Sequence, residues 1–154
     1  MEPIFHLALV HPEIGGNAGN VGRLCLNVGA RLHLVHPLGF QTDAKAVRRA
    51  GLDYWKHVDS REHPSLDDFD RWCQGRPIYA LSSHATVPYT RIPFEEGCVL
   101  VLGRESVGLP PEWTARHPSF RIPMVGPTRS LNVANAASVV AYAALQALRP
   151  ALFG

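Results

Sequence analysis

Four groups of polar residues follow short apolar runs in this sequence, and they hold the side chains best suited to chemistry. The groups are Asn17 with Asn20 and Arg23, Ser-Ser-His at 82–84, Gly-Arg-Glu at 103–105, and the stretch 126–135. Glu105 is the one carboxylate among them. This inventory suits hydrogen bonding to a polyhydroxyl or amide ligand and to phosphate, rather than covalent catalysis.

Each of these residues also has a purely structural explanation. Asn17 and Asn20 can form turns, Ser130 can cap a helix, and Arg23 can face solvent on a helix surface. Ligands of open α/β sheets bind outside the carboxyl ends of the strands. Because the groups recur at successive strand ends, we expect them to form one site.

The elements that must position these residues alternate along the chain. A glycine-rich turn is expected at 15–20, and Gly29 stands where a helix C-cap belongs. Strands are predicted at 4–10, 31–36, 54–58, 77–82, 98–102 and 120–124, and helices up to 28 and at 43–49, 66–73, after 110 and at 130–148. This alternation predicts an α/β fold, with a mostly parallel sheet and helices on both faces. Residues 1–154 are expected to form a single domain.

Several familiar site types are absent from the sequence. The glycines at 16, 19 and 22 break the dinucleotide-binding spacing, and there is no phosphate-binding P-loop. Ser106 lacks the first glycine of a nucleophile elbow. His33 and His36 lie three residues apart on a predicted strand and therefore point to opposite faces, and the remaining histidines form no cluster along the chain. We therefore expect no metal site.

The composition limits the partners and the compartment. Fifteen Lys and Arg residues against thirteen Asp and Glu give a net charge of +2, which neither requires nor excludes a nucleic-acid partner. Lys45 and Lys56 are the only lysines, an arginine bias that is compatible with RNA contacts or with genomic base composition. Three cysteines without a C-x-x-C pair favour a reducing, cytoplasmic setting. The uncharged stretch 130–148 contains Asn132, Asn135 and Gln146, which favours a buried helix over a membrane span.

Three segments, in order, resemble the motifs of a known family. They are NAGNVGRLCLNVG at 17–29, LGRESVGLP at 102–110 and IPMVGPTRSLNVANAAS at 122–138. The chain resembles the SPOUT superfamily of RNA 2′-O-ribose methyltransferases, and most of all its single-domain tRNA (cytidine/uridine-34-2′-O)-methyltransferases. The segments 37–40 and 48–54 are also similar to that group. The chain departs from it at Gly16, where the family often has Pro, and at 104–107, where the family often has Pro-Glu-Thr-Arg.

The resemblance implies a fold, a cofactor and a reaction. The family folds with a deep C-terminal trefoil knot, which periodicity cannot reveal. It binds S-adenosylmethionine in a bent shape and releases S-adenosylhomocysteine, without a metal. Carried over by position, the residues expected to contact the cofactor are Leu81, Gly103, Ile122, Met124, Ser130 and Leu131.

The resemblance also implies catalytic roles, because a ribose 2′-hydroxyl must attack the sulfonium methyl group. The family assigns proton removal to the arginine that matches Arg23, but a guanidinium is very hard to deprotonate. Our hypothesis is that Arg23 anchors phosphate or stabilises the developing alkoxide. Ser130 and Asn132 would then hydrogen-bond the ribose, while Asn17 and Glu105 hold this network.

The expected substrate is the wobble nucleotide C34 or U34 in a tRNA anticodon stem-loop. The alternatives are another tRNA or rRNA position, or a non-catalytic RNA-binding protein on the same scaffold. The family acts as a homodimer. An apolar stripe on the last predicted helix fits such packing or packing within the domain, and consists of Val133, Ala137, Val140, Ala144 and Leu148, widened by Val139, Ala143 and Ala147. Basic residues expected around a shared cleft are Lys45, Arg48, Arg49, Arg104, Arg121 and Arg129.

Overall fold

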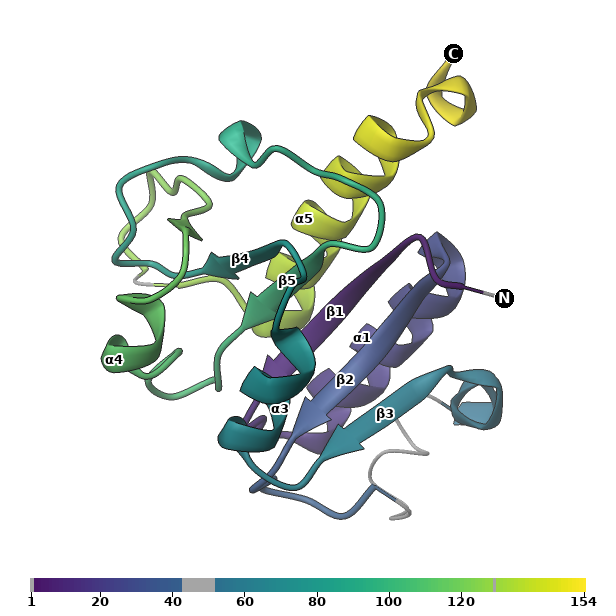
Figure 1. Cartoon of the computed structure of the whole chain (residues 1–154), viewed down its shortest axis with the longest axis vertical. Coiled ribbons are helices and arrows are strands. Elements are labelled where there is room, and N and C mark those ends of the chain that lie inside the picture. Colours follow the sequence, from purple (N-terminus) through teal and green to yellow (C-terminus); the bar gives the residue numbers. More distant parts are fainter. Residues whose placement is uncertain (1, 43–51, 129) are drawn as a thin grey trace.

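A six-stranded sheet in which every strand pair is parallel forms the centre of the molecule (Figure 1). This computed structural model describes residues 2–42, 52–128 and 130–154. The strands are β1 (Phe5–Val10), β2 (Ala30–Val35), β3 (Ser60–His63), β4 (Ile78–Leu81), β5 (Val99–Leu102) and β6 (Ser119–Phe120), in the spatial order β3-β2-β1-β5-β4-β6. The predicted α/β class with a parallel sheet is confirmed. All residues of β1, β4 and β5 are buried, as expected of strands covered on both faces.

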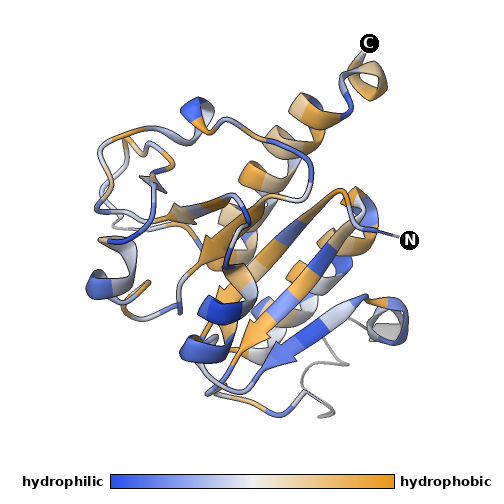
Figure 2. Ribbon diagram, viewed as in Figure 1, coloured by the Kyte–Doolittle hydropathy of each residue, from blue (hydrophilic) through white to orange (hydrophobic). Residues whose placement is uncertain are grey.

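Helices cover both faces of the sheet. Helices α1 (Gly15–Val28) and α5 (Val133–Leu148) pack on the face to which Leu7 and Leu9 contribute. Helix α3 (Leu66–Cys73) and the short α4 (Pro111–Thr114) pack on the other face with Ala8 and Val10. Figure 2 shows the same division, with apolar strands at the centre and polar residues on the outward side of α3. No helix among the described residues is long and apolar enough to cross a membrane.

The segment 15–20 is helical, so the turn predicted there is wrong. Helix α1 begins at Gly15, and Ile14 at its N-cap supplies no side-chain acceptor. The carboxylate of Glu105, from a distant loop, instead accepts from the N–H groups of Glu13 and Ile14 just before the helix, which local sequence cannot reveal. The predicted end of the helix is confirmed. Gly29 has φ 71°, and its N–H donates to the Cys25 carbonyl.

Three further boundaries differ from prediction. Residues Leu52–His57 form a 3₁₀ helix, η1, instead of a strand, because Trp55 packs on α1. Strand β6 ends at Phe120, short of residue 124. Helix α5 begins at Val133, because the Asn132 side chain accepts hydrogen bonds from the N–H groups of Ala134 and Asn135, so Ser130 is not the cap. The helix predicted at 43–49 lies outside the described residues.

The apolar stripe predicted on α5 packs within the domain over most of its length. Val133, Ala137, Val140 and Ala144 are buried against α1 and the sheet. The outward side of the helix remains accessible, with Tyr142 44% exposed and Val139 and Ala143 half-buried. The intramolecular alternative therefore explains the stripe itself, and only its neighbours are left to contact another molecule.

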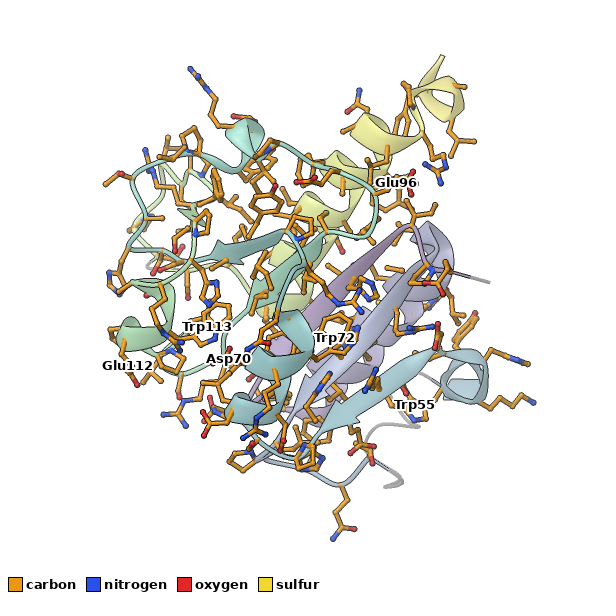
Figure 3. All side chains as sticks on the ribbon, viewed as in Figure 1. Trp55, Asp70, Trp72, Glu96, Glu112 and Trp113 are labelled. Carbon is orange, nitrogen blue, oxygen red and sulfur yellow. The ribbon has the colours of Figure 1, made fainter. Side chains whose placement is uncertain are left out.

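Three histidines form a hydrogen-bonded row across β1, β2 and β3, so the expectation that no histidines cluster is wrong. His33 Nε2 lies 2.9 Å from His6 Nδ1, and His33 Nδ1 lies 2.9 Å from His63 Nε2. Parallel register brings these rings together although they are far apart in sequence. Trp72 of α3 covers them, with its ring centroid 4.2 Å from that of His33 (Figure 3).

The row is neutral and structural. Burial lowers the pKa of His33 to about 2 and that of His6 to about 4. A neutral imidazole has one donor and one acceptor nitrogen, so His33 donates to one neighbour and accepts from the other. Within the described residues, no group of three His, Cys, Asp or Glu side chains is arranged to hold a metal ion.

Candidate active site

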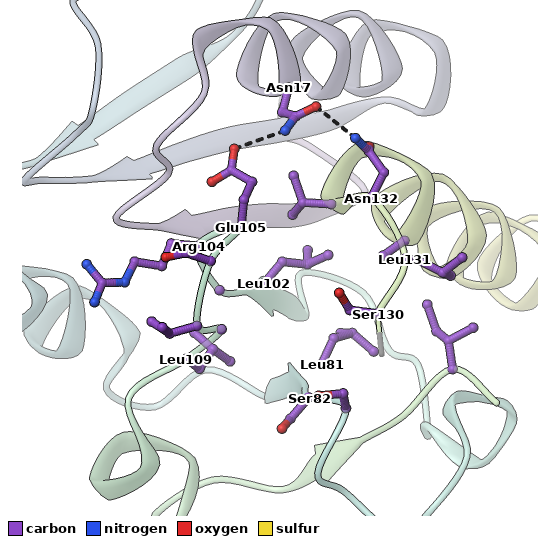
Figure 4. A pocket seen from close by; sticks show the side chains of 18 of the residues that line it. Asn17, Leu81, Ser82, Leu102, Arg104, Glu105, Leu109, Ser130, Leu131 and Asn132 are labelled. Carbon is purple, nitrogen blue, oxygen red and sulfur yellow. Dashed lines mark hydrogen bonds between the residues drawn. The ribbon is translucent and has the colours of Figure 1, made fainter. Parts of the chain in front are cut away.

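A cavity of about 860 Å³ lies at the carboxyl ends of β4 and β5 (Figure 4). Four loops and the start of α1 surround it, which agrees with the general position of ligand sites in parallel α/β sheets. The residues predicted for the site that line it are Asn17, Leu81, Gly103, Glu105, Ile122, Met124, Ser130, Leu131 and Asn132. The structure therefore brings together nine of the ten predicted positions, of which eight come from the three sequence motifs and Leu81 lies outside them.

Glu105 caps the beginning of α1. Its Oε1 accepts from the Glu13 N–H at 2.8 Å, and its Oε2 accepts from the Ile14 N–H at 3.0 Å and from Asn17 Nδ2 at 3.0 Å. A negative charge at this end of the helix also interacts favourably with the helix dipole. Because three donors engage the carboxylate, Glu105 acts as a structural acceptor and not as an accessible base.

The hydrogen bonds continue from Glu105 through Asn17 to Asn132, and only one assignment of donors and acceptors fits them. The Asn132 oxygen is engaged as the cap of α5, so its Nδ2 is the group that donates to Asn17 Oδ1, at 3.2 Å. Asn17 must then direct its own Nδ2 to Glu105, whose ionised carboxylate can only accept. The start of α1, the start of α5 and the loop after β5 are thus fixed relative to one another. We call Glu105, Asn17 and Asn132 the amide–carboxylate chain.

Glu13 supports the site without lining the cavity, and sequence reasoning missed it. Its carboxylate accepts from the Ser106 N–H at 2.8 Å, and hydrogen bonds from Ser106 lower the pKa of this carboxyl. Glu13 and Glu105 therefore cross-link the β1–α1 and β5–α4 loops in both directions. Local sequence carries no signal for this role, because the donor is the backbone of a loop 93 positions away.

Gly103 is required by the fold of its own loop. A Cβ atom there would lie 2.2 Å from the Gly108 carbonyl carbon and 2.2 Å from the Leu109 nitrogen. The Gly108 N–H donates to the Arg104 carbonyl at 2.9 Å, and Gly108 has φ 75°. The loop after β5 therefore turns back over Gly103, and this turn places Glu105 at α1.

The cavity wall is divided between apolar and polar groups. Leu81, Leu102, Leu109 and Val133 are buried side chains that contribute to it. Ser82, Ser130 and Asn132 add hydroxyl and amide groups, and Arg104 adds a cation. Such a wall suits an elongated ligand with an apolar body and polar ends.

Arg23 is the one predicted site residue that does not line the cavity. It lies exposed on α1, with its guanidinium carbon 4.5 Å from the centre of the Tyr54 ring. Two of the basic residues expected around a cleft can be located. Arg104 lines the cavity, and Arg121 is exposed and directly precedes the lining residue Ile122. Lys45, Arg48, Arg49 and Arg129 lie outside the described residues.

Fold and site together define a parallel α/β protein with a ligand cavity built from three motifs at the strand ends. The sequence pattern of the SpoU rRNA Methylase family matches residues 4–142, and the chain belongs to this family. It is 41% identical over 145 residues to a tRNA (cytidine(34)-2′-O)-methyltransferase of Methylovorus glucosotrophus, covering 92% of this chain and 94% of that relative.

Solved structures agree with this family assignment. One, described as "Structural insights into the 2-OH methylation of C/U34 on tRNA", has a TM-score of 0.93 and 45% identity, covering 96% of this chain and 98% of that chain. An AdoMet-bound rRNA methyltransferase from Sinorhizobium meliloti has a TM-score of 0.88 and 26% identity. The alignment with it covers 96% of this chain and 58% of that longer chain.

Proposed function

We propose that this protein transfers a methyl group from S-adenosylmethionine to the ribose 2′-hydroxyl of the wobble nucleotide, C34 or U34, in tRNA. The observation that carries the proposal is the amide–carboxylate chain, which joins the three motifs at one cavity. The similarity to a tRNA (cytidine(34)-2′-O)-methyltransferase over nearly the whole chain supports this substrate.

The cavity fits the cofactor in size and chemistry. Its volume lies within the usual range of about 300–1,000 Å³ for small-molecule sites. The residues that would hold the cofactor are Leu81, Gly103, Ile122, Met124, Ser130 and Leu131. When bound, S-adenosylmethionine supplies an electrophilic methyl group on a positively charged sulfur and leaves as S-adenosylhomocysteine. The apolar part of the wall offers the positively charged sulfur few polar partners, which favours a reaction in which that charge is lost.

The chain's own residues orient the RNA. Ser130 and Asn132 lie at the cavity wall, where they can hydrogen-bond a ribose, and Asn17 fixes the Asn132 amide. Glu105 in turn fixes Asn17. Arg23 holds the phosphate or stabilises the developing alkoxide as the 2′-hydroxyl loses its proton to solvent, because a guanidinium donates hydrogen bonds but does not titrate.

The position of Arg23 supports a homodimer in which it serves the cavity of the second copy. Within one chain it lies outside the cavity wall, so the site lacks it. The outward side of α5 offers Tyr142 at 44% exposure, and Leu131 in the cavity wall is also exposed. An interface over these residues would bury apolar surface and cover the cavity mouth.

Two further expectations belong to this proposal. The likeness to SpoU structures supports a C-terminal trefoil knot in a single domain spanning 1–154. The three cysteines are free and buried, which supports a cytoplasmic protein. The alternative of an rRNA target has one specific observation in its favour, the AdoMet-bound rRNA methyltransferase among the similar structures.

Methyl transfer from labelled S-adenosylmethionine tests the proposal directly. Total tRNA and rRNA are incubated separately with the protein, and the labelled nucleotide is mapped. We expect label on the 2′-oxygen of residue 34 in tRNA. Label confined to another tRNA position or to rRNA would overturn the substrate, and cofactor binding without transfer to either RNA would overturn the enzymatic function.

Subunit complementation tests the placement of Arg23. Arg23→Ala and Asn132→Ala are each expected to be inactive in methyl transfer. Mixed after reversible dissociation, they should recover about one quarter of wild-type activity, because half of the dimers carry one intact site of two. Failure of the mixture to recover activity, with mixed dimers shown to form, would contradict the shared site. An Arg23→Ala protein with full activity would remove its proposed role.

A further inference from the structure

Helix η1 is seated directly on α1 through a glycine. A Cβ atom on Gly22 would lie 2.8 Å from Cζ3 of Trp55 and 3.3 Å from a methyl carbon of Val58. The indole ring therefore occupies the space that any other residue at position 22 would fill. The Val58 N–H donates to the Trp55 carbonyl at 3.1 Å and closes the turn after the indole. This packing fixes the position of the η1 backbone relative to α1.

This seat brings Tyr54 against Arg23, the next residue of α1. The guanidinium carbon of Arg23 lies 4.5 Å from the centre of the Tyr54 ring, within the range of a cation–π contact. Tyr54 is 38% exposed, so the pair lies at the surface. Among the described residues, Arg23 makes no ion pair and no hydrogen bond to another side chain or carbonyl.

The kind of side chain that contacts Arg23 determines whether its charge and its N–H donors remain available to a ligand. A carboxylate partner would neutralise the charge and occupy the N–H donors along one edge. An aromatic ring contacts the flat face of the guanidinium and leaves both the charge and the five N–H donors available. The ring also restricts the side-chain rotamers before a ligand binds, which reduces the entropy lost on binding.

We propose that Tyr54 is a positioning residue that holds the Arg23 guanidinium by its face, with its N–H edge presented to a phosphate of the RNA substrate. This inference rests on the proposed function for its substrate. It adds a residue outside the cavity and outside the motif that contains Arg23. Tyr54 acts through Arg23 and contacts neither the cofactor cavity nor the amide–carboxylate chain.

A double-mutant cycle with a conservative control tests the proposal. Tyr54→Leu should lower kcat/KM for tRNA by about two- to fivefold, the range expected for an exposed cation–π contact. Tyr54→Phe keeps the ring and should retain nearly wild-type kcat/KM. Because Arg23→Ala is expected to be inactive in methyl transfer, the double-mutant comparison is made in equilibrium binding of tRNA, where Tyr54→Leu should cause no further loss of affinity in the Arg23→Ala background. Affinity for S-adenosylmethionine and the melting temperature should be the same in the Leu and Phe variants.

Several outcomes would overturn the proposal. They are an equal loss in the Leu and Phe variants, a further loss in the Arg23→Ala background, or a fall in cofactor affinity in Tyr54→Leu. The binding cycle is expected to show coupling between positions 23 and 54. If the wild-type protein binds tRNA but does not methylate it, the proposed function fails, and the binding cycle still confirms or contradicts the role of Tyr54.

Discussion

The side-chain amide of Asn132 donates a hydrogen bond to the amide oxygen of Asn17 at 3.2 Å, although 115 positions separate them in the chain. Each of the two residues is occupied at its other end, Asn132 by the start of α5 and Asn17 by Glu105. Neither amide can turn over without losing hydrogen bonds at both ends. The cavity wall thus has one fixed polarity before any ligand binds, which is the preorganisation that an oriented ribose requires.

Asn17→Asp is the sharpest test of that polarity. The substitution replaces the donor that faces Glu105 with a second carboxylate, while the acceptor for Asn132 remains. Because Asn17 is only 8% exposed, the repulsion between the two carboxylates is poorly screened. We expect the free energy of unfolding to fall by about 1–3 kcal/mol at neutral pH. Part of this loss should be reversed in mild acid, where the pair of carboxylates takes up a proton.

Urea unfolding at pH 7.5 and 5.5, with methyl transfer measured in parallel, checks this expectation. Asn20→Asp is the matched control, since Asn20 lies exposed on the same helix. Equal changes in unfolding free energy for Asn17→Asp and Asn20→Asp would show that the amide–carboxylate chain does not stabilise the fold.

Glu105→Gln tests the cap of α1. Glutamine keeps one acceptor oxygen but turns an N–H₂ group toward donors, so at least one of the Glu13, Ile14 and Asn17 donors loses its partner. We expect a loss of about 1–2 kcal/mol in unfolding free energy and weaker binding of S-adenosylmethionine, measured by titration calorimetry. Glu112 is exposed on α4, so Glu112→Gln should change neither the unfolding free energy nor the affinity for S-adenosylmethionine.

Local patterns predicted β1, β4 and β5, because strands buried on both faces read as continuous apolar runs. Strand β3 was not predicted, since only one of its four residues is buried. The end of α1 at Gly29 was predictable for a similar reason, since a left-handed residue favours glycine. The start of α1 was not, because its cap is Glu105, more than 90 positions away. Tyr54–Val58 looked like a strand, and only the space over Gly22 explains why Trp55 packs on α1 instead.

The candidate site shows the same difference between features set by local sequence and features set by contacts between distant residues. Residue types at strand ends predicted that the groups at 17, 103–105 and 126–135 gather, whereas Leu81, Ile122 and Met124 came from the family resemblance. Nine of the ten predicted positions line the cavity. Arg23 faces solvent on α1, which was the structural alternative given for it, and only the family resemblance had given it a catalytic role. The histidine row was equally hidden, since its contacts depend on the register of three strands.

The histidine row should make folding sensitive to acid. Burial lowers the folded-state pKa of His33 to about 2 and of His6 to about 4, against 6.5 in an unfolded chain. Below pH 6.5 the unfolded chain therefore takes up protons that the folded chain does not. Stability is fully present above pH 6.5 and falls as the pH drops from 6.5 toward 4, with a slope of up to about 1.4 kcal/mol per pH unit for each such histidine.

Urea unfolding between pH 7.5 and 4.5 measures this slope. His33→Leu removes the central ring, so the protein should be less stable at pH 7.5 but should lose stability less steeply in acid. His84→Gln, at an exposed position, should leave the slope unchanged. A wild-type unfolding free energy that does not change from pH 6.5 to 4.5 would show that the row is not buried and neutral in solution.

Gly103→Ala tests whether the loop after β5 depends on a missing side chain. The added Cβ would lie 2.2 Å from two backbone atoms of the same loop, a distance that only movement of the backbone can relieve. That movement displaces Glu105 from α1, so we expect a stability loss of about 3 kcal/mol or more together with loss of cofactor binding. Gly126→Ala is the matched control, because a Cβ there meets no atom within 4 Å. Calorimetric melting and cofactor titration of both variants measure the effect. Equal behaviour of the two alanine variants would mean that the loop opens readily and that Glu105 is held by α1 rather than by its own turn.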